Sequence, residues 1–154
     1  MKTRFVTSIA ILVMVSAALA APMISKESPD ELNWLTDLPE AQQLAEENGK
    51  SILVNFTGSD WCKWCIKLRD EVFSQQEFAE YASENLILVE LDFPRKTFQP
   101  QEVKDRNQKY ASQYKVRGFP TIMLLEAGGD VIAQTGYQAG GAVTYVKHLE
   151  SLLP

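Results

Sequence analysis

The sequence predicts an α/β domain whose mixed β-sheet is covered by helices on both faces. Helical and strand-like segments alternate over most of the chain, in the order α-β-α-β-α-β-β-α. Such alternation is typical of parallel strands joined by crossover helices. Near the end, two apolar runs flank residues 127–130, a short glycine-containing connection that predicts an antiparallel hairpin. Both kinds of strand pairing are therefore expected in one sheet.

The expected helices are placed by signals at their ends. Asp37 is expected to cap the first helix, and Gly49 to close it. The second helix is expected to begin at two cysteines, after a Thr-Gly-Ser-Asp turn. Ser74 and Glu77 have the spacing of a capping box for a further helical segment. The remaining helices are expected over residues 101–114 and 142–153.

The expected strands are short apolar runs bounded by turn residues. They cover residues 52–56 (ILVNF), 86–93 (LILVELDF), 121–125 (TIMLL) and 131–135 (VIAQT). The polar stretch DFPRKTFQPQ, at residues 92–101, is longer than a bare connection requires. It could either contact a partner or remain a solvated loop.

The first 20 residues have the layout of a secretory signal peptide. A basic start with Lys2 and Arg4 precedes an apolar run, and an A-x-A cleavage site ends at Ala20. The run is shorter than the roughly 20 residues that span a bilayer, which argues against an uncleaved anchor. We expect export to the periplasm or the medium, with a signal peptide at residues 1–20, a flexible lead-in at 21–30 and a single domain at 31–154.

The charge of the chain excludes one class of partner. The formal charge is −5, and cleavage after Ala20 removes two cations and no acids, which leaves −7. An acidic domain without a basic cluster is a poor candidate for nucleic-acid binding. No segment after residue 21 is apolar for long enough to cross a membrane. We expect a soluble monomer without stable membrane insertion.

The chain contains two cysteines, Cys62 and Cys65, within the stretch WCKWC. A disulfide between them closes so short a loop that it stabilises the fold little, which disfavours a purely structural bridge. Structural zinc usually takes four Cys or His ligands, and His148 is the chain's single histidine. Two soft thiolates can hold copper(I), so a copper(I)-binding or metallochaperone module stays open beside a redox couple.

A C-x-x-C pair that follows a strand and opens a helix is typical of a thiol–disulfide redox site. Cys62 would lie at the helix N-terminus, where unpaired backbone N–H groups and the helix dipole stabilise an anion. Thiols in such places have pKa values of about 3.5–7.5 instead of about 8.5, which produces a nucleophilic thiolate. Cys65 would lie one turn later, less exposed, and would resolve the mixed disulfide.

Two motifs together give the chain a family resemblance. WCKWC, with VRGFPT at residues 116–121, resembles the active-site pattern of the thioredoxin superfamily. FTGSDWCKWCIKLRDEVFSQQEF and LDFPRK resemble exported thioredoxin-like proteins of the thioredoxin-7 type, from about residue 34 to the C-terminus. The resemblance implies a thioredoxin fold with a central mixed four-stranded sheet and a cis Pro120 that faces the disulfide. It also implies that the backbone of Phe119 pairs with an extended substrate.

Departures from the family pattern concern residues that tune the cysteines. The buried acid that shuttles the proton of the second cysteine in thioredoxins maps to Asn55, which cannot titrate. Glu90 falls beside it on the next strand, so Glu90 or water could carry this proton, or Glu90 could simply face solvent. Lys63 and Trp64 replace the Gly-Pro of thioredoxin, and a cation there favours the thiolate. One lysine cannot place the potential within the family span of roughly −270 to −120 mV.

The sequence therefore predicts an exported thioredoxin-like protein-disulfide oxidoreductase. Cys62 would attack the disulfide, Cys65 would resolve it, and Trp61, Phe119 and Pro120 would contact the substrate. No cofactor is expected beyond the redox-active Cys62–Cys65 disulfide, because the chain carries no nicotinamide or flavin fingerprint. Expected partners are protein thiols and disulfides and an external electron donor or acceptor, for which a membrane protein is one candidate. Reduction, oxidation and isomerisation all remain open.

Overall fold

The computed structural model of the protein describes residues 32–154. Its centre is a five-stranded sheet in the order β1-β3-β2-β4-β5. β1, β3 and β2 are parallel, whereas β4 runs antiparallel to β2 and forms a hairpin with β5. The strands are β1 (Trp34–Leu35), β2 (Ser51–Thr57), β3 (Leu86–Asp92), β4 (Thr121–Leu125) and β5 (Val131–Thr135). The expected mixed sheet and its four expected strands are confirmed.

The strand that sequence reasoning missed is β1, which makes the sheet five-stranded instead of four-stranded. Trp34 and Leu35 pair in parallel with Leu88 and Val89 of β3. Two residues are too few to show an alternating apolar pattern, which needs at least about four positions. The short strand covers the outer edge of β3, which would otherwise present unpaired backbone groups.

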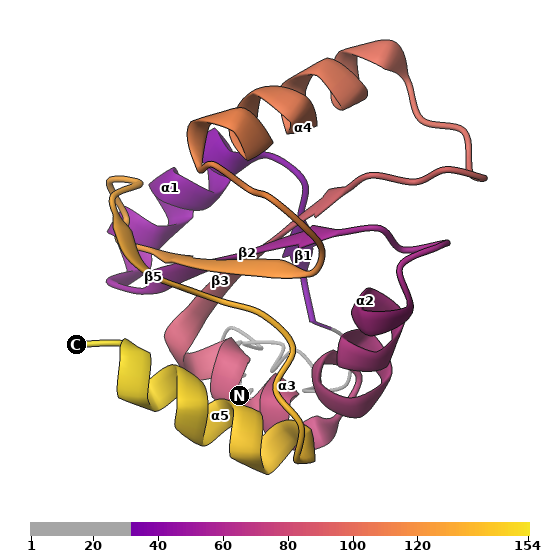
Figure 1. The fold of residues 1–154 in the computed structure, drawn as a ribbon. Coiled ribbons are helices and arrows are strands. Elements are labelled where there is room, and N and C mark those ends of the chain that lie inside the picture. Colours follow the sequence, from indigo (N-terminus) through magenta and orange to yellow (C-terminus); the bar gives the residue numbers. More distant parts are fainter. Residues whose placement is uncertain (1–31) are drawn as a thin grey trace, which may run out of the picture.

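Helices cover both faces of the sheet (Figure 1). α1 and α4 lie on one face, and α3 and α5 lie on the other. The bounds are α1 (Leu38–Asn48), α2 (Lys63–Leu68), the π-helical turn η1 (Arg69–Phe73), α3 (Gln76–Asn85), α4 (Gln101–Gln113) and α5 (Gly141–Leu152). The expected signal peptide and lead-in lie outside the described residues. Within residues 32–154, no helix combines the length and apolar character that a membrane span requires.

The helix ends agree with the sequence signals at α1 and differ at α3. Asp37 occupies the N-cap of α1, although its side chain makes no capping hydrogen bond, and Gly49 closes the helix with a φ of 65°. The capping box expected to start at Ser74 is wrong. Ser74 instead ends η1, because its N–H donates to the Arg69 carbonyl and its backbone (φ −92°, ψ 7°) lacks the extended geometry of an N-cap. α3 begins only after Gln75.

Alternation along β2 directs side chains into two buried apolar layers. Leu53 lies in the layer under α3 and α5, where it joins Phe78 and Tyr145. Phe56 lies in the opposite layer, under α1 and α4, with Leu38, Ala41, Val89, Leu91, Ala111 and Met123. Close packing from both sides makes the sheet a rigid support for the loops at its ends.

Candidate active site

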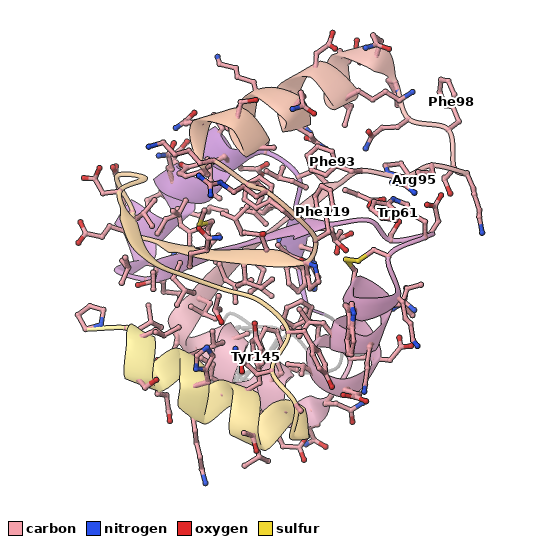
Figure 2. The ribbon with its side chains drawn as sticks, viewed as in Figure 1. Trp61, Phe93, Arg95, Phe98, Phe119 and Tyr145 are labelled. Carbon is pink, nitrogen blue, oxygen red and sulfur yellow. A yellow bond between two sulfur atoms is a disulfide. The ribbon has the colours of Figure 1, made fainter. Side chains whose placement is uncertain are left out.

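The cysteine turn, the loop after β3 and Pro120 meet at one end of the sheet. β2 and β3 are parallel, so the segments that follow Thr57 and Asp92 leave the sheet at the same end. β4 is antiparallel to β2 and pairs Thr121 with Phe56, which brings Pro120 to that end as well. Figure 2 shows the disulfide just below the labelled side chains of Trp61, Phe93, Arg95 and Phe119.

Cys62 and Cys65 are joined by a disulfide, with their Cα atoms 5.2 Å apart. Cys62 is the N-cap of α2, and its sulfur accepts a hydrogen bond from the backbone N–H of Cys65 at 3.2 Å. The two residues are 6% and 4% exposed, a difference too small for exposure to assign their roles. Position along the helix does distinguish them, because backbone N–H groups at a helix N-terminus stabilise an anionic sulfur.

The Phe119–Pro120 peptide bond, just before β4, is cis. The Thr121 hydroxyl donates to the Gly118 carbonyl at 2.8 Å, which closes a tight turn there. The Phe119 ring packs against Phe93, with ring centroids 5.0 Å apart, and against Trp61, with centroids 5.8 Å apart. The turn therefore places Phe119 against the residue that precedes Cys62.

Trp61 is held by contacts on several sides and is not a freely exposed side chain. Its Nε1–H donates to the Phe93 carbonyl at 2.8 Å, and its ring meets Phe119 edge-on. The Arg95 guanidinium lies over the same ring, 3.6 Å from the centroid. A Cβ on Gly58 would come within 2.5 Å of the indole, so the ring needs glycine at this position. Trp61 is therefore a fixed wall beside Cys62.

Asp60 ties the cysteine turn to the loop after β3. Its carboxylate accepts hydrogen bonds from the consecutive backbone N–H groups of Arg95, Lys96 and Thr97, at 3.0, 2.7 and 2.8 Å. These bonds, led by the one from Arg95, lower the pKa of Asp60 to about 2. Sequence reasoning missed this residue, because the Thr-Gly-Ser-Asp turn signals a bend but not which distant backbone its carboxylate will meet.

Asp60→Asn should loosen this loop while the domain stays folded. An amide offers one neutral acceptor oxygen in place of two charged ones, and charge-assisted hydrogen bonds are roughly twice as strong as neutral ones. We expect the amides of residues 95–97 to exchange with solvent about tenfold faster at neutral pH, as measured by hydrogen exchange. Asp105→Asn, at an exposed position of α4, is the control. Equal exchange rates for these amides in Asp60→Asn and the wild type would contradict the role of Asp60 in holding the loop.

The lowered pKa of Asp60 also fixes the sign of the pH dependence. A carboxylate with a depressed pKa stabilises the fold above its ordinary pKa and loses that contribution as the pH falls through the lowered value. Protection of residues 95–97 in the wild type should therefore be complete above the ordinary value of 3.8 and lost toward about 2.

Asn55 and Glu90 lie side by side in neighbouring strands. They are paired in the register of β2 and β3, and Asn55 Nδ2 donates to a Glu90 carboxylate oxygen at 3.4 Å. Asn55 is buried, and its Oδ1 has no hydrogen-bond partner within the described residues. Burial, followed by the charge of Asp92, raises the pKa of Glu90. Glu90 is half-buried against Asn55 and is not simply a solvent-facing side chain.

Glu90→Gln should raise the free energy of unfolding at neutral pH relative to the wild type. A raised pKa means that the folded state binds the Glu90 proton more tightly than the unfolded state does. The wild type is therefore most stable, relative to the variant, below the ordinary Glu pKa, and loses this advantage as the pH rises through the raised value. Urea unfolding between about pH 4 and 8 measures the difference. Glu84→Gln, at an exposed position of α3, is the control, and parallel pH profiles for all three chains would contradict the prediction.

Trp64 and Lys63 lie at the solvent side of the cysteine pair. Trp64 is 51% exposed, yet its ring lies 5.2 Å from the Tyr137 ring, centroid to centroid. Lys67 lies over both rings and pairs with Glu71, which accepts the Tyr137 hydroxyl hydrogen bond. Trp64 thus packs on one side and leaves the other side open, whereas Lys63 is exposed.

The residues considered for metal binding do not gather around the cysteines. In the described part of the chain, no group of three or more His, Cys, Asp or Glu side chains is placed to hold a metal ion. His148 instead hydrogen bonds to Thr135 through Nε2 at 2.8 Å. The described residues therefore do not build a four-ligand zinc site around Cys62 and Cys65.

Comparisons with known proteins point to one family. A model of the thioredoxin-like domain matches residues 38–150. The disulfide bond reductase DsbH of Chlamydia pneumoniae is 42% identical over 122 residues, which cover 79% of this chain and 73% of that protein. The thioredoxin-related protein DsbJ of the same organism is 28% identical over 131 residues, which cover 80% of this chain and 38% of that protein.

Solved structures agree with this assignment. A structure of DsbH oxidoreductase has a TM-score of 0.76 and 41% identity, over 80% of this chain and 85% of the other. A thioredoxin from Thermus thermophilus has a TM-score of 0.58 and 22% identity, over 79% and 86% of the two chains, which supports the fold. With the Cys62–Cys65 disulfide, these similarities confirm the expected class of thioredoxin-like protein-disulfide oxidoreductase. The chain belongs to the thioredoxin-like domain family.

Proposed function

We propose that this chain is an exported reductase of protein disulfides. The observation that carries the direction of the reaction is the 42% identity, over 79% of this chain, to a protein named disulfide bond reductase. The site supplies the attacking group, because Cys62 lies at the start of a helix, where backbone N–H groups stabilise a nucleophilic thiolate. Export is supported by the signal-peptide layout of residues 1–20.

In the proposed reaction, the reduced chain gives two electrons to a substrate disulfide. The Cys62 thiolate attacks one substrate sulfur and forms a mixed disulfide, while the other substrate sulfur leaves as a thiolate and takes a proton. Cys65 then loses its proton and attacks the Cys62 sulfur. The mixed disulfide breaks, and the first substrate sulfur leaves and is protonated. The substrate ends with two thiols, and the chain ends with the Cys62–Cys65 disulfide.

The residues around Cys62 would hold the substrate. The turn at Phe119 and Pro120 offers extended backbone at the start of β4, and an extended substrate segment could pair with it by main-chain hydrogen bonds. Trp61, fixed by its bond to the Phe93 carbonyl, would form the adjoining wall. The exposed part of Trp64 would extend this wall on the far side of the cysteines.

Two groups would tune the cysteines. Lys63 is exposed beside Cys62 and would favour its thiolate. Glu90, whose pKa is raised by burial, would accept the Cys65 proton in place of the acid that Asn55 cannot provide. The position of Glu90 next to Asn55 in the strand register supports this role.

The oxidised chain must be reduced again before each turnover. Its electrons would come from an external dithiol protein, and a membrane protein that passes electrons outward is one candidate. Such a donor would attack Cys62 in the reverse of the substrate reaction, which needs no further cofactor.

Insulin reduction with dithiothreitol as electron donor tests the proposed function. The chain should speed the precipitation of the insulin B chain well above the rate with dithiothreitol alone. A reduction potential near roughly −270 mV would support the reductase direction, and one near roughly −120 mV would overturn it. Titration of the reduced chain with copper(I) tests the rival function, because tight copper binding without turnover would overturn the enzyme.

A further inference from the structure

We propose that residues 93–100, the loop between β3 and α4, form a docking arm for substrate segments that carry an acidic and a bulky apolar side chain near the disulfide. The docking arm includes Arg95, Lys96 and Phe98, and Lys63, which follows Cys62 in the chain, is a further exposed cation. The inference rests on the proposed function and adds a substrate class to it.

The docking arm is built into the fold at its base. Asp60 accepts the backbone N–H groups of residues 95–97. Ser59 donates through its N–H and its hydroxyl to the carboxylate of Asp92, at 2.9 and 2.6 Å. Gln99 and Asn107 both donate to the Asp92 carbonyl, at 3.2 and 2.9 Å. Five residues thus fix both ends of a segment that could otherwise have been a loose, solvated connection.

Phe98 is presented to solvent by this fixed segment. It is 86% exposed, whereas the other exposed large apolar residues of the described chain are 51–52% exposed. Figure 2 shows Phe98 projecting from the end of the docking arm, on the side of the molecule that carries the disulfide. Single exposed apolar residues are common, but this one stands on a pinned loop that begins beside the active site, and a partner side chain could bury it.

The docking arm is continuous with the wall of the active site. Arg95 lies over the Trp61 ring, and Trp61 precedes Cys62. Phe98 is three residues from Arg95, which an extended chain covers in about 10 Å. A substrate segment that is joined to Cys62 and runs along the docking arm would meet Arg95 first and Phe98 several residues later.

The charge of the docking arm is opposite to that of the chain. Its cations, Arg95 and Lys96, and also Lys63 are exposed, on a chain with a formal charge of −5. Among residues 32–154, the two ion pairs lie within α2 and η1 and involve none of these three cations. The nearby Asp60 carboxylate keeps its negative charge, but it accepts backbone N–H groups and pairs with none of these three side chains. Charge complementarity therefore favours acidic substrate segments over basic ones.

Three synthetic peptides test the docking arm. Each contains one internal disulfide and differs only in two residues, separated from the first cysteine by a constant three-residue spacer, which are Asp-Leu, Lys-Leu or Asp-Ser. Dithiothreitol restores the reduced chain after each turnover. The wild type should favour Asp-Leu over Lys-Leu by about fivefold to tenfold in kcat/KM, since exposed charge contacts are individually weak, and high salt should reduce this preference. It should favour Asp-Leu over Asp-Ser by about threefold.

Two variants locate these preferences. Lys96→Glu should bring the Asp-Leu to Lys-Leu ratio close to 1 or below it, and Phe98→Ser should remove the preference for Leu over Ser. Lys147→Glu and Val143→Ser make the same changes on exposed positions of α5 and should keep both wild-type ratios. Equal kcat/KM for all three peptides in the wild type, or the same loss in the α5 variants, would overturn the docking arm. If the wild type reduced none of the three peptides and did not reduce insulin, the proposed function itself would be overturned, and this inference with it.

Discussion

Cys62→Ser should abolish the reduction of insulin, whereas Cys65→Ser should accumulate a mixed disulfide with the substrate. A serine at position 62 removes the thiolate that the start of α2 stabilises, so turnover should fall by at least about a thousandfold. A serine at position 65 leaves the attacking thiolate intact and removes the sulfur that resolves the adduct. The two variants should therefore fail at different steps, although both lose turnover.

Non-reducing electrophoresis and intact-mass measurement distinguish the two failures. Cys65→Ser, mixed with an excess of two identical peptides joined by one intermolecular disulfide, should gain the mass of one peptide, and dithiothreitol should remove it. The double variant Cys62→Ser, Cys65→Ser should gain no mass. An adduct on Cys62→Ser with none on Cys65→Ser would show that Cys65 attacks first, and the assignment of the two roles would be reversed.

The parts of this site that the sequence predicts are those fixed by local chemistry. The pair Cys62 and Cys65 could be placed at the start of a helix, because a strand, a turn and a helical pattern follow one another in sequence. Gly49 could be placed at a helix end, because glycine adopts the left-handed backbone of a helix C-terminus without a steric penalty. Glu90 could be placed beside Asn55 because strand positions can be counted in parallel once two strands are assigned.

The parts that the sequence does not predict depend on contacts between segments far apart in the chain. Asp60 meets backbone groups 35 to 37 residues away, and no spacing rule encodes which loop a carboxylate will reach. β1 is stabilised by its neighbour β3 and has too few residues to carry a pattern of its own. Ser74 has the spacing of a helix N-cap, but the preceding helix continues as a π-helical turn through Phe73. Ser74 therefore ends that helix and does not begin the next one. Asp60 and β1 carry no local signal, whereas at Ser74 the local signal is overridden by the continuing helix.

One part of the molecule supports the active-site helix, and another part carries the cysteines. The layer under α3 and α5 holds the sheet and the end of η1, and through them the helix that carries Cys65. Phe73, at the end of η1, packs against Phe78 of α3 and Tyr145 of α5, with ring centroids 4.8 and 6.1 Å apart. The far end of the active-site helix is thus anchored in the aromatic core, while its first turn carries the Cys62–Cys65 disulfide.

Tyr145→Ala should lower the free energy of unfolding by about 3–5 kcal/mol, a large part of the roughly 5–15 kcal/mol that a domain has. Tyr145 is fully buried, and its removal leaves a cavity beside Phe73. Its hydroxyl donates to the Gly136 carbonyl at 3.1 Å, so Tyr145→Phe should cost only about 1 kcal/mol. Urea unfolding of the oxidised chains, followed by tryptophan fluorescence, measures both values.

Val143→Ala is the matched control for this prediction, because Val143 lies on the same helix but is 51% exposed. It should change the free energy of unfolding by no more than about 0.5 kcal/mol. If Tyr145→Ala cost no more than this control, the aromatic layer would not be what anchors η1. A large loss in Tyr145→Ala, with Tyr145→Phe in between, would show that the ring supplies most of the anchoring. Support for the active-site helix would then come mainly from apolar packing and not from the hydrogen bond to Gly136.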